Sequence, residues 1–188
     1  AVPVGEGAMA AILGLDFETV QSVVQSAAQG QVCAAANDND PAQVVVSGHK
    51  AAVERAAAEA KAAGARRALM LPVSAPFHCS LMTPAAEAMA QALSEVDINT
   101  PVVPVVANVV AEAITDPATL RSLLVDQVCG SVRWRESVVW MGEQGVTETW
   151  EIGAGKALTG MVKRINRAIA TRAINTPADV RAAAEALT

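Results

Sequence analysis

The stretch Pro72-Val-Ser-Ala-Pro-Phe-His-Cys-Ser-Leu-Met82 separates two parts of the sequence that have different patterns. It contains His78, one of two histidines in the chain, and its two prolines stiffen the backbone before that residue. An apolar run typical of a strand, residues 68–73, leads into it, and a helical pattern, residues 84–93, follows it. A histidine on a stiff loop between a strand and a helix is a candidate general base or acid, although many such histidines have no chemical role.

Towards the N-terminus, hydrophobic spacing and turn residues predict the element order β-α-β-β-α-β. Strands are predicted at residues 8–15, 31–36, 43–47 and 68–73, and helices at 17–29 and 50–63. We expect a turn at residues 37–41 to join the two central strands in a hairpin, because Asn and Asp fold their side chains onto the backbone and Pro fixes φ. This order is the split βαβ, or ferredoxin-like, arrangement, so residues 1–73 are predicted to form a ferredoxin-like small subdomain.

Towards the C-terminus, helices alternate with a small number of strands. Helices are predicted at residues 84–96, from Pro117 with Asp116 as its cap, and at 133–142, 157–171 and 178–187. Strand-like segments are predicted at 102–110 and 147–152. Strands that alternate with helices imply a parallel sheet, but two or three strands make a poor sheet by themselves. We therefore predict that residues 74–188 are part of a larger α/β domain.

Composition and charge narrow the functional classes. The 188 residues carry a net charge of −5 without a long basic run, which argues against nucleic acid as a partner. Cys33, Cys79 and Cys129 are widely spaced and form no Cys-x-x-Cys pair, which argues against a disulfide framework or a structural zinc site and favours a reducing, cytoplasmic location. No apolar run approaches the roughly 18 residues of a membrane span. Because the sequence starts at Ala1 without an initiator methionine, we expect it to be a fragment of a longer protein.

Three further motifs have competing interpretations. The segment Gly153-Ala-Gly-Lys156 either holds a phosphate or carboxylate on free N–H groups or is a close turn between strand and helix; it fits neither a P-loop nor a dinucleotide fingerprint. Cys79 next to His78 would make a thiol dyad, but neighbouring residues on an extended loop usually point apart. The Asn and Asp residues at 37–40 lack the pattern of a calcium loop, and His49 is expected to be an exposed turn residue.

Five motifs occur in an order that resembles one enzyme family. They are Gly7-Ala-Met-Ala-Ala-Ile-Leu-Gly-Leu15, Asn37-x-Asn39-x-Pro-x-Gln-Val-Val-Val-Ser-Gly-His49, Leu71-Pro-Val-Ser-x-Pro-x-His-Cys-x-Leu-Met82, Pro104-Val-Val-x-Asn108 and Glu151-x-Gly-x-Gly-Lys-x-Leu-Thr-Gly160. Together they cover essentially the whole chain and are similar to the malonyl-CoA:acyl-carrier-protein transacylases of bacterial fatty-acid synthesis. The resemblance implies an α/β-hydrolase-like core with a parallel sheet, of which residues 74–188 would form the C-terminal part.

In that family, a serine on a Gly-x-Ser-x-Gly elbow takes the malonyl group from coenzyme A, a histidine activates the serine, and the group passes to the phosphopantetheine thiol of acyl carrier protein. The resemblance carries the role of general base and acid to His78, and places at Gln127 a backbone carbonyl that orients the ring. It implies malonyl-CoA as substrate and no cofactor. No Gly-x-Ser-x-Gly occurs in this sequence. In that family the serine, the malonate-binding arginine and the oxyanion glutamine all precede the ferredoxin-like part. The resemblance therefore implies that none of the three has a counterpart here, and the chain alone is predicted to be inactive.

The expected partners follow from the same resemblance. Arg66 and Arg67 form a small basic patch with Lys61, and we expect the acidic acyl carrier protein to dock there. A missing N-terminal segment or self-association would cover the apolar surface that an incomplete core exposes. Two alternatives remain: a non-catalytic ferredoxin-like binding module, and a cysteine hydrolase that uses Cys79 or Cys129 with His78.

Overall fold

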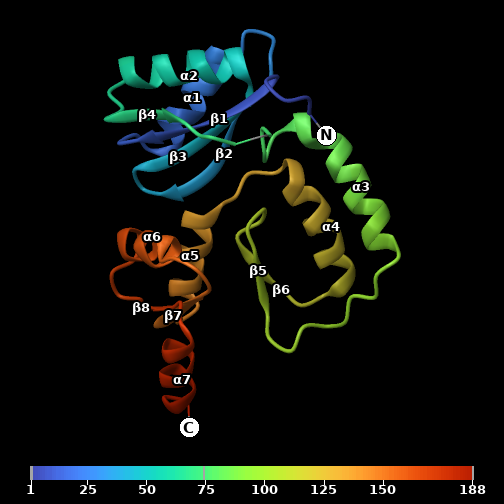
Figure 1. The fold of residues 1–188 in the computed structure, drawn as a ribbon, viewed down its shortest axis with the longest axis vertical. Coiled ribbons are helices and arrows are strands. Elements are labelled where there is room, and N and C mark those ends of the chain that lie inside the picture. Colours follow the sequence, from blue (N-terminus) through green and yellow to red (C-terminus); the bar gives the residue numbers. More distant parts are fainter. Residues whose placement is uncertain (1, 74, 188) are drawn as a thin grey trace. The chain divides into compact units, whose positions relative to one another are not determined.

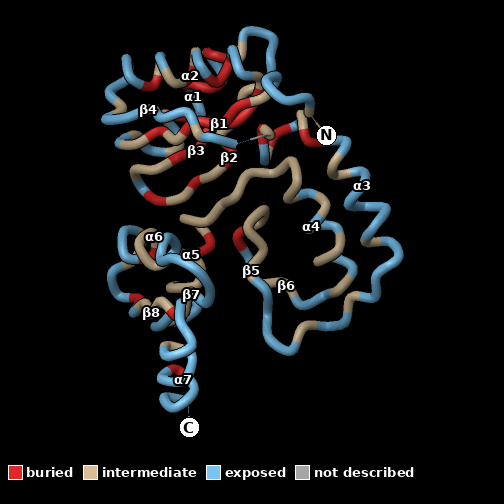
Figure 2. The backbone as a smooth tube through the Cα atoms, viewed as in Figure 1, coloured by how far each residue is buried: buried red, intermediate tan, exposed pale blue. Residues whose placement is uncertain are grey.

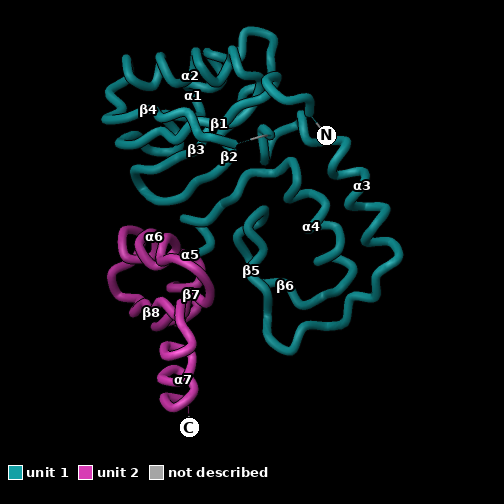
Figure 3. The backbone as a smooth tube through the Cα atoms, viewed as in Figure 1, with its two compact units in different colours: residues 1–137 teal, residues 138–188 magenta. Residues whose placement is uncertain are grey.

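The structure, a computed structural model, describes residues 2–73 and 75–187 (Figure 1). The chain divides into two compact units, residues 1–137 and residues 138–188 (Figure 3). The division falls within helix α5 (Trp134–Glu143). The predicted boundary between residues 73 and 74 lies inside the first unit, so the division into a ferredoxin-like subdomain and a larger core stays a prediction.

Unit 1 begins with a four-stranded antiparallel sheet. Its strands are β1 (Gly7–Leu13), β2 (Cys33–Asp40), β3 (Gln43–His49) and β4 (Arg67–Met70), in the spatial order β2-β3-β1-β4. Helices α1 (Phe17–Ala28) and α2 (Lys50–Ala62) connect β1 to β2 and β3 to β4, and they lie together over one face of the sheet (Figure 1). The predicted βαββαβ, ferredoxin-like arrangement is therefore confirmed.

Local sequence signals set both ends of α1. Asp16 Oδ1 accepts a hydrogen bond from the Thr19 N–H at 2.8 Å, which satisfies one of the free amides at the helix start. Gln29 and Gly30 then adopt positive φ angles of 46° and 82°. A left-handed residue at this position ends a helix, so the predicted cap and the predicted stop are both found.

The main core lies between the sheet and its two helices. Successive strand residues point to opposite faces, so every second residue of β1 and β3 enters this core. Its buried members are small aliphatic side chains, as the composition predicts: Ala8, Ala10, Ile12, Val20, Val23, Val24, Ala27, Val44, Val46, Val53, Ala56 and Ala60. Figure 2 shows buried residues gathered in this part of unit 1. Full burial of one valine or isoleucine side chain contributes about 1.5–3 kcal/mol.

The opposite face of the sheet is covered by the chain that follows β4. A second, smaller cluster of buried residues there consists of Met9, Ala36 and Val45. Ser47, two residues after Val45 and therefore on the same face, is fully buried. A short 3₁₀ helix, Ser80–Met82, contacts β3. The sheet thus supports the segment that contains His78.

The predicted turn at residues 37–41 is wrong in its position. Residues 37–40 belong to β2, and the hairpin turns at Pro41 and Ala42, where Asp40 Oδ1 accepts a hydrogen bond from the Ala42 N–H at 3.0 Å. Asp38 is buried, and its backbone N–H donates to the Val132 carbonyl at 2.9 Å. A partner so distant in sequence overrules the local turn signal of the Asn and Asp residues.

The rest of unit 1 is less buried. It contains α3 (Thr83–Ser94), an antiparallel hairpin of β5 (Val105–Ala107) and β6 (Glu112–Ile114), and α4 (Pro117–Cys129). As predicted, Asp116 caps α4 by accepting a hydrogen bond from the Thr119 N–H at 2.7 Å. The strand-like run 102–110 is a three-residue strand followed by a turn, and β6 was not predicted. Neither α3 nor α4 contains a buried residue (Figure 2).

Unit 2 contains a β-α-β element. Strands β7 (Glu148–Ile152) and β8 (Ala170–Ile174) pair in parallel, and α6 (Ala157–Ile165) connects them, which confirms the predicted parallel sheet. The predicted helix 157–171 is wrong at its C-terminal end, because Asn166 follows α6 and its Oδ1 accepts a hydrogen bond from the Ala168 N–H at 3.0 Å. Helix α7 (Pro177–Glu185) comes last. None of the described helices is long and apolar enough to cross a membrane.

Candidate active site

His78 contacts the end of helix α4. Its Nδ1 atom lies 3.0 Å from the backbone carbonyl oxygen of Gln127. A carbonyl oxygen can only accept a hydrogen bond, so Nδ1 carries the proton in the neutral ring and Nε2 keeps a free lone pair. The structure therefore brings His78 and Gln127 together in the arrangement that a histidine base requires.

The Gln127 carbonyl is free to accept this hydrogen bond because of its place in α4. The last four carbonyls of a helix have no partner within the helix, and α4 ends at Cys129. The Gln127 side chain also fixes this end, since its Nε2 donates to the Gly130 carbonyl at 2.9 Å.

The backbone of His78 is strained. Its φ angle is 59°, in the left-handed region that residues with a Cβ atom rarely adopt. Such a conformation costs of order 1–3 kcal/mol and persists only where the surrounding structure imposes it. Left-handed non-glycine residues are concentrated at functional sites, so this angle is an independent reason to regard His78 as a candidate site residue.

The other histidine, His49, is held differently. It is the last residue of β3 and is half-buried, and its Nδ1 accepts a hydrogen bond from the Val32 N–H at 2.9 Å. The prediction of an exposed turn residue is therefore wrong for His49. Its ring must carry the proton on Nε2, the tautomer opposite to that of His78.

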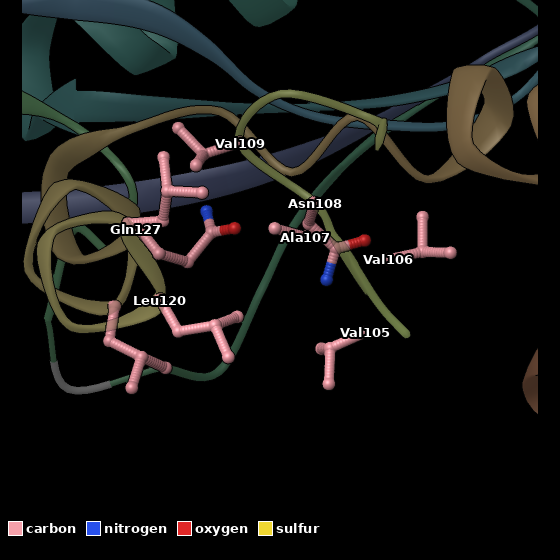
Figure 4. A pocket seen from close by; sticks show the side chains of 9 residues that line it. Val105, Val106, Ala107, Asn108, Val109, Leu120 and Gln127 are labelled. Atoms are coloured by element: carbon pink, nitrogen blue, oxygen red, sulfur yellow. The ribbon is translucent and has the colours of Figure 1, made fainter. Parts of the chain in front are cut away.

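A small pocket adjoins Gln127. It has a volume of about 190 Å³ and lies between β5, the turn that follows it, and α4. The side-chain amides of Gln127 and Asn108 lie in this pocket among apolar side chains, mostly valine and leucine (Figure 4). The pocket offers an apolar space with two polar groups beside the His78–Gln127 pair.

Arg66 and Arg67 lie elsewhere in unit 1. Both are exposed, at the start of β4, and the segment that leads to His78 leaves from the other end of that strand. With Leu13 they line an open pocket of about 290 Å³. Among the described residues, neither arginine forms an ion pair, so their charges face solvent. The structure does not bring them into contact with His78 or Gln127.

Cys79 and Cys33 lack the properties of a nucleophile. Cys79 is buried, and its Sγ–H donates to the Pro76 carbonyl at 3.1 Å rather than to His78. Burial raises the pKa of the Cys79 thiol, and burial raises the pKa of Cys33 to about 11. A nucleophilic cysteine requires a lowered pKa. These observations argue against a cysteine hydrolase that uses Cys79, and none of them bears on Cys129.

The segment 153–156 is a turn whose helix start is already occupied. Glu151, which precedes it, accepts hydrogen bonds from the Leu158 N–H at 3.1 Å and the Thr159 N–H at 2.7 Å. These hydrogen bonds, chiefly that of Thr159, hold the pKa of the Glu151 carboxyl below its usual value. The protein's own carboxylate therefore takes the N–H groups that a bound anion would need. The signal in the sequence that could have indicated this role is the position of Glu151, an acidic residue just before the two glycines of the turn.

Sequence reasoning also missed an ion pair between Asp38 and Arg135. The Asp38 side chain is 1% exposed and that of Arg135 is 29% exposed. No local signal marks this pair, because its members belong to β2 and α5, far apart in the sequence.

Comparison with known proteins gives a consistent result. No family model matches the chain. It is 50% identical over 185 residues to the malonyl CoA-acyl carrier protein transacylase of Escherichia coli K12, a match that covers 98% of this chain and 60% of that protein. The protein of the same name from Bacillus subtilis is 44% identical, and the match covers 100% of this chain and 59% of that protein.

Solved structures agree with these relatives. The acyl-carrier-protein S-malonyltransferase of Bartonella henselae superimposes with a TM-score of 0.95 at 47% identity, covering 99% of this chain and 59% of that one. A malonyl-transacylase solved in complex with a type II polyketide synthase acyl carrier protein superimposes with a TM-score of 0.92 at 44% identity. This match covers 98% of this chain and 60% of that one. The chain is thus a homologue of the malonyl CoA-acyl carrier protein transacylases and corresponds to about three fifths of their length.

Proposed function

We propose that this chain is part of a transacylase that moves a malonyl group from coenzyme A to acyl carrier protein, with His78 as the general base and acid. The names of its homologues support the reaction. The observation that carries the role of His78 is the 3.0 Å contact of its Nδ1 with the Gln127 carbonyl, because it leaves Nε2 free to accept a proton.

In the proposed reaction, Nε2 accepts the proton of a serine hydroxyl as the serine oxygen bonds to the malonyl thioester carbon. The carbon–sulfur bond then breaks, and the coenzyme A thiolate leaves with the proton from Nε2. In the second half, Nε2 accepts the proton of the phosphopantetheine thiol as the thiol sulfur attacks the carbonyl carbon of the malonyl–serine ester. The bond between that carbon and the serine oxygen then breaks, and the serine oxygen takes the proton from Nε2. The sequence has no serine elbow, so the nucleophile must come from outside these residues.

This proposal is tested with a hybrid enzyme. The part of the E. coli transacylase that has no match in this chain is joined to the 188 residues, and malonyl transfer is measured. The chain alone should show no activity above the blank, and His78→Ala in the hybrid should lower kcat/KM about 10²–10⁴-fold, the usual contribution of general base catalysis. His49→Gln is the matched control and should retain activity if the hybrid stays folded. An unchanged rate for His78→Ala would remove His78 from the mechanism.

We also propose that acyl carrier protein docks on Arg66 and Arg67. One structural relative was solved as a complex with such a carrier. The two arginines support docking here because both are exposed and line one open pocket. Exposed basic side chains attract an acidic partner and speed its association.

A further inference from the structure

We propose that the ferredoxin-like sheet positions His78 through a buried anchor formed by Ser47, Cys79 and Pro76. The consequence for proton transfer rests on the function proposed above, whereas the positioning itself does not. In this view the thiol of Cys79 is a structural hydrogen-bond donor and Ser47 and Cys79 are positioning residues.

The anchor is a short chain of buried hydrogen bonds. Ser47 Oγ, on β3, lies 3.8 Å from Cys79 Sγ and donates to it. Cys79 Sγ lies 3.1 Å from the Pro76 carbonyl and donates to that oxygen. Both side chains are almost completely buried, with 0% and 2% exposure. Each polar atom thus has a partner inside the protein, which is the condition for keeping it there.

Pro76 is held from the other side by β1. Its side chain is fully buried, and a Cβ atom added at Gly7 would lie only 2.4 Å from Pro76 Cγ. Gly7 is therefore required by the close approach of the proline ring to the strand. The two residues that flank Phe77 and His78 are both fixed, since Pro76 packs on β1 and Cys79 bonds to β3.

These two fixed points confine the backbone of His78. Phe77 and His78 are the only residues between Pro76 and Cys79, and His78 takes its left-handed φ of 59° there. A strained conformation persists only when neighbouring contacts impose it. The anchor supplies those contacts, and the ring is then directed at the Gln127 carbonyl.

The same sheet also holds the segment after Gln127. The Val132 N–H donates to the Ala36 carbonyl at 2.8 Å, and the Asp38 N–H donates to the Val132 carbonyl at 2.9 Å. Ser131 Oγ adds a hydrogen bond to the Ala36 carbonyl at 3.2 Å. One sheet therefore fixes both partners, His78 through β3 and the end of α4 through β2.

The test uses the 188-residue chain and the ¹⁵N shifts of its two histidine rings in long-range ¹H–¹⁵N spectra. In the unchanged chain at high pH, His78 should show the Nδ1–H tautomer and His49 the Nε2–H tautomer. Cys79→Ala should move the two His78 nitrogens toward averaged shifts and leave His49 unchanged. Cys79→Ser, which keeps a donor, should restore the His78 pattern. Cys33→Ala is the matched thiol control.

The pattern of His49 shows whether each variant is folded. If Cys79→Ala does not fold, Ser47→Ala, which removes a single oxygen atom, takes its place with the same expected readout. A folded variant in which His78 keeps the Nδ1–H tautomer would overturn the proposal. These spectra need no substrate, so their outcome is separate from that of the transacylase assay. In the active hybrid, Cys79→Ala should lower kcat by about 10-fold to 10²-fold, the cost of a misplaced catalytic group, with KM for malonyl-CoA unchanged.

Discussion

Arg135 Nε lies 3.0 and 2.9 Å from the two carboxylate oxygens of Asp38, and its guanidinium adds a third contact at 2.8 Å. The Asp38 side chain is buried, whereas the Arg135 side chain is 29% exposed. The two partners therefore differ in what their removal leaves behind. Loss of Arg135 leaves a buried charge without a partner, and loss of Asp38 leaves a charge that water can still solvate.

We expect Arg135→Ala to lower the free energy of unfolding by about 3–5 kcal/mol at pH 7, and Asp38→Ala to lower it by less. Urea denaturation followed by circular dichroism measures both. Glu136→Gln is the control, because the Glu136–Arg133 pair is more than one-third exposed on both sides and should contribute about 0.2–1 kcal/mol at most. Equal losses for Arg135→Ala and Asp38→Ala would contradict the assigned asymmetry.

The same pair predicts a pH dependence. Burial raises the pKa of the Asp38 carboxyl, although the Arg135 guanidinium opposes the shift. A carboxyl whose pKa is higher in the folded state favours folding below its unfolded pKa, about 4, and loses that contribution as pH rises through the folded value. Arg135→Ala should raise the pKa of Asp38 in the folded state further. The loss in free energy of unfolding that this variant shows against the unchanged protein should therefore shrink as pH falls from 7 to 5.

Glu151 should behave in the opposite sense. Its pKa is lowered by the N–H groups at the start of α6. Its contribution to the stability of unit 2 is therefore present above the unfolded pKa of glutamate, about 4.3, and is lost as pH falls through the lower folded value. Glu151→Gln should speed hydrogen exchange of the α6 amides at pH 7, and the difference should fade in acid.

Glu143→Gln, at the exposed end of α5, is the control for this measurement. The exchange should be read on the amides of residues 158–162 by nuclear magnetic resonance. If Glu151→Gln leaves them as well protected as before, the carboxylate does not hold the start of α6, and the glycine turn becomes available to another anion.

The proposed carrier surface predicts a kinetic effect of charge reversal. In the hybrid enzyme, Arg66→Glu combined with Arg67→Glu should raise the apparent KM for acyl carrier protein several-fold, because it repels an acidic partner. The effect should shrink at high ionic strength, since salt screens exposed charges. Arg181→Glu, an exposed arginine on α7, is the matched control. An unaltered KM for the double variant would place the docking surface elsewhere.

Local signals in the sequence account for the first half of the fold. Asp16 and Gly30 mark the ends of α1, and apolar and β-branched runs predict the strands on which it packs. The errors arise where contacts between residues far apart in the sequence determine the local structure. Residues 37–40 read as a turn by their composition, yet Val132 and Arg135 hold them in β2. The three-residue strand β6 is too short to produce a periodic pattern.

The candidate site divides in the same way. The motif around His78 and the position of Gln127 followed from resemblance to a family, and the structure brings the two residues together. The buried roles of Ser47, Cys79 and Gly7 do not follow from any local pattern. They depend on how the loop packs against the sheet, and only the folded chain contains that information.

The His78–Gln127 pair and its anchors lie between residues 7 and 132, entirely within unit 1. A reorientation of unit 2 about α5 would therefore leave the geometry of this pair unchanged. The ferredoxin-like sheet therefore holds His78 and the end of α4 through contacts that do not involve unit 2. Exchange of residues 138–188 should therefore leave the His78–Gln127 hydrogen bond in place.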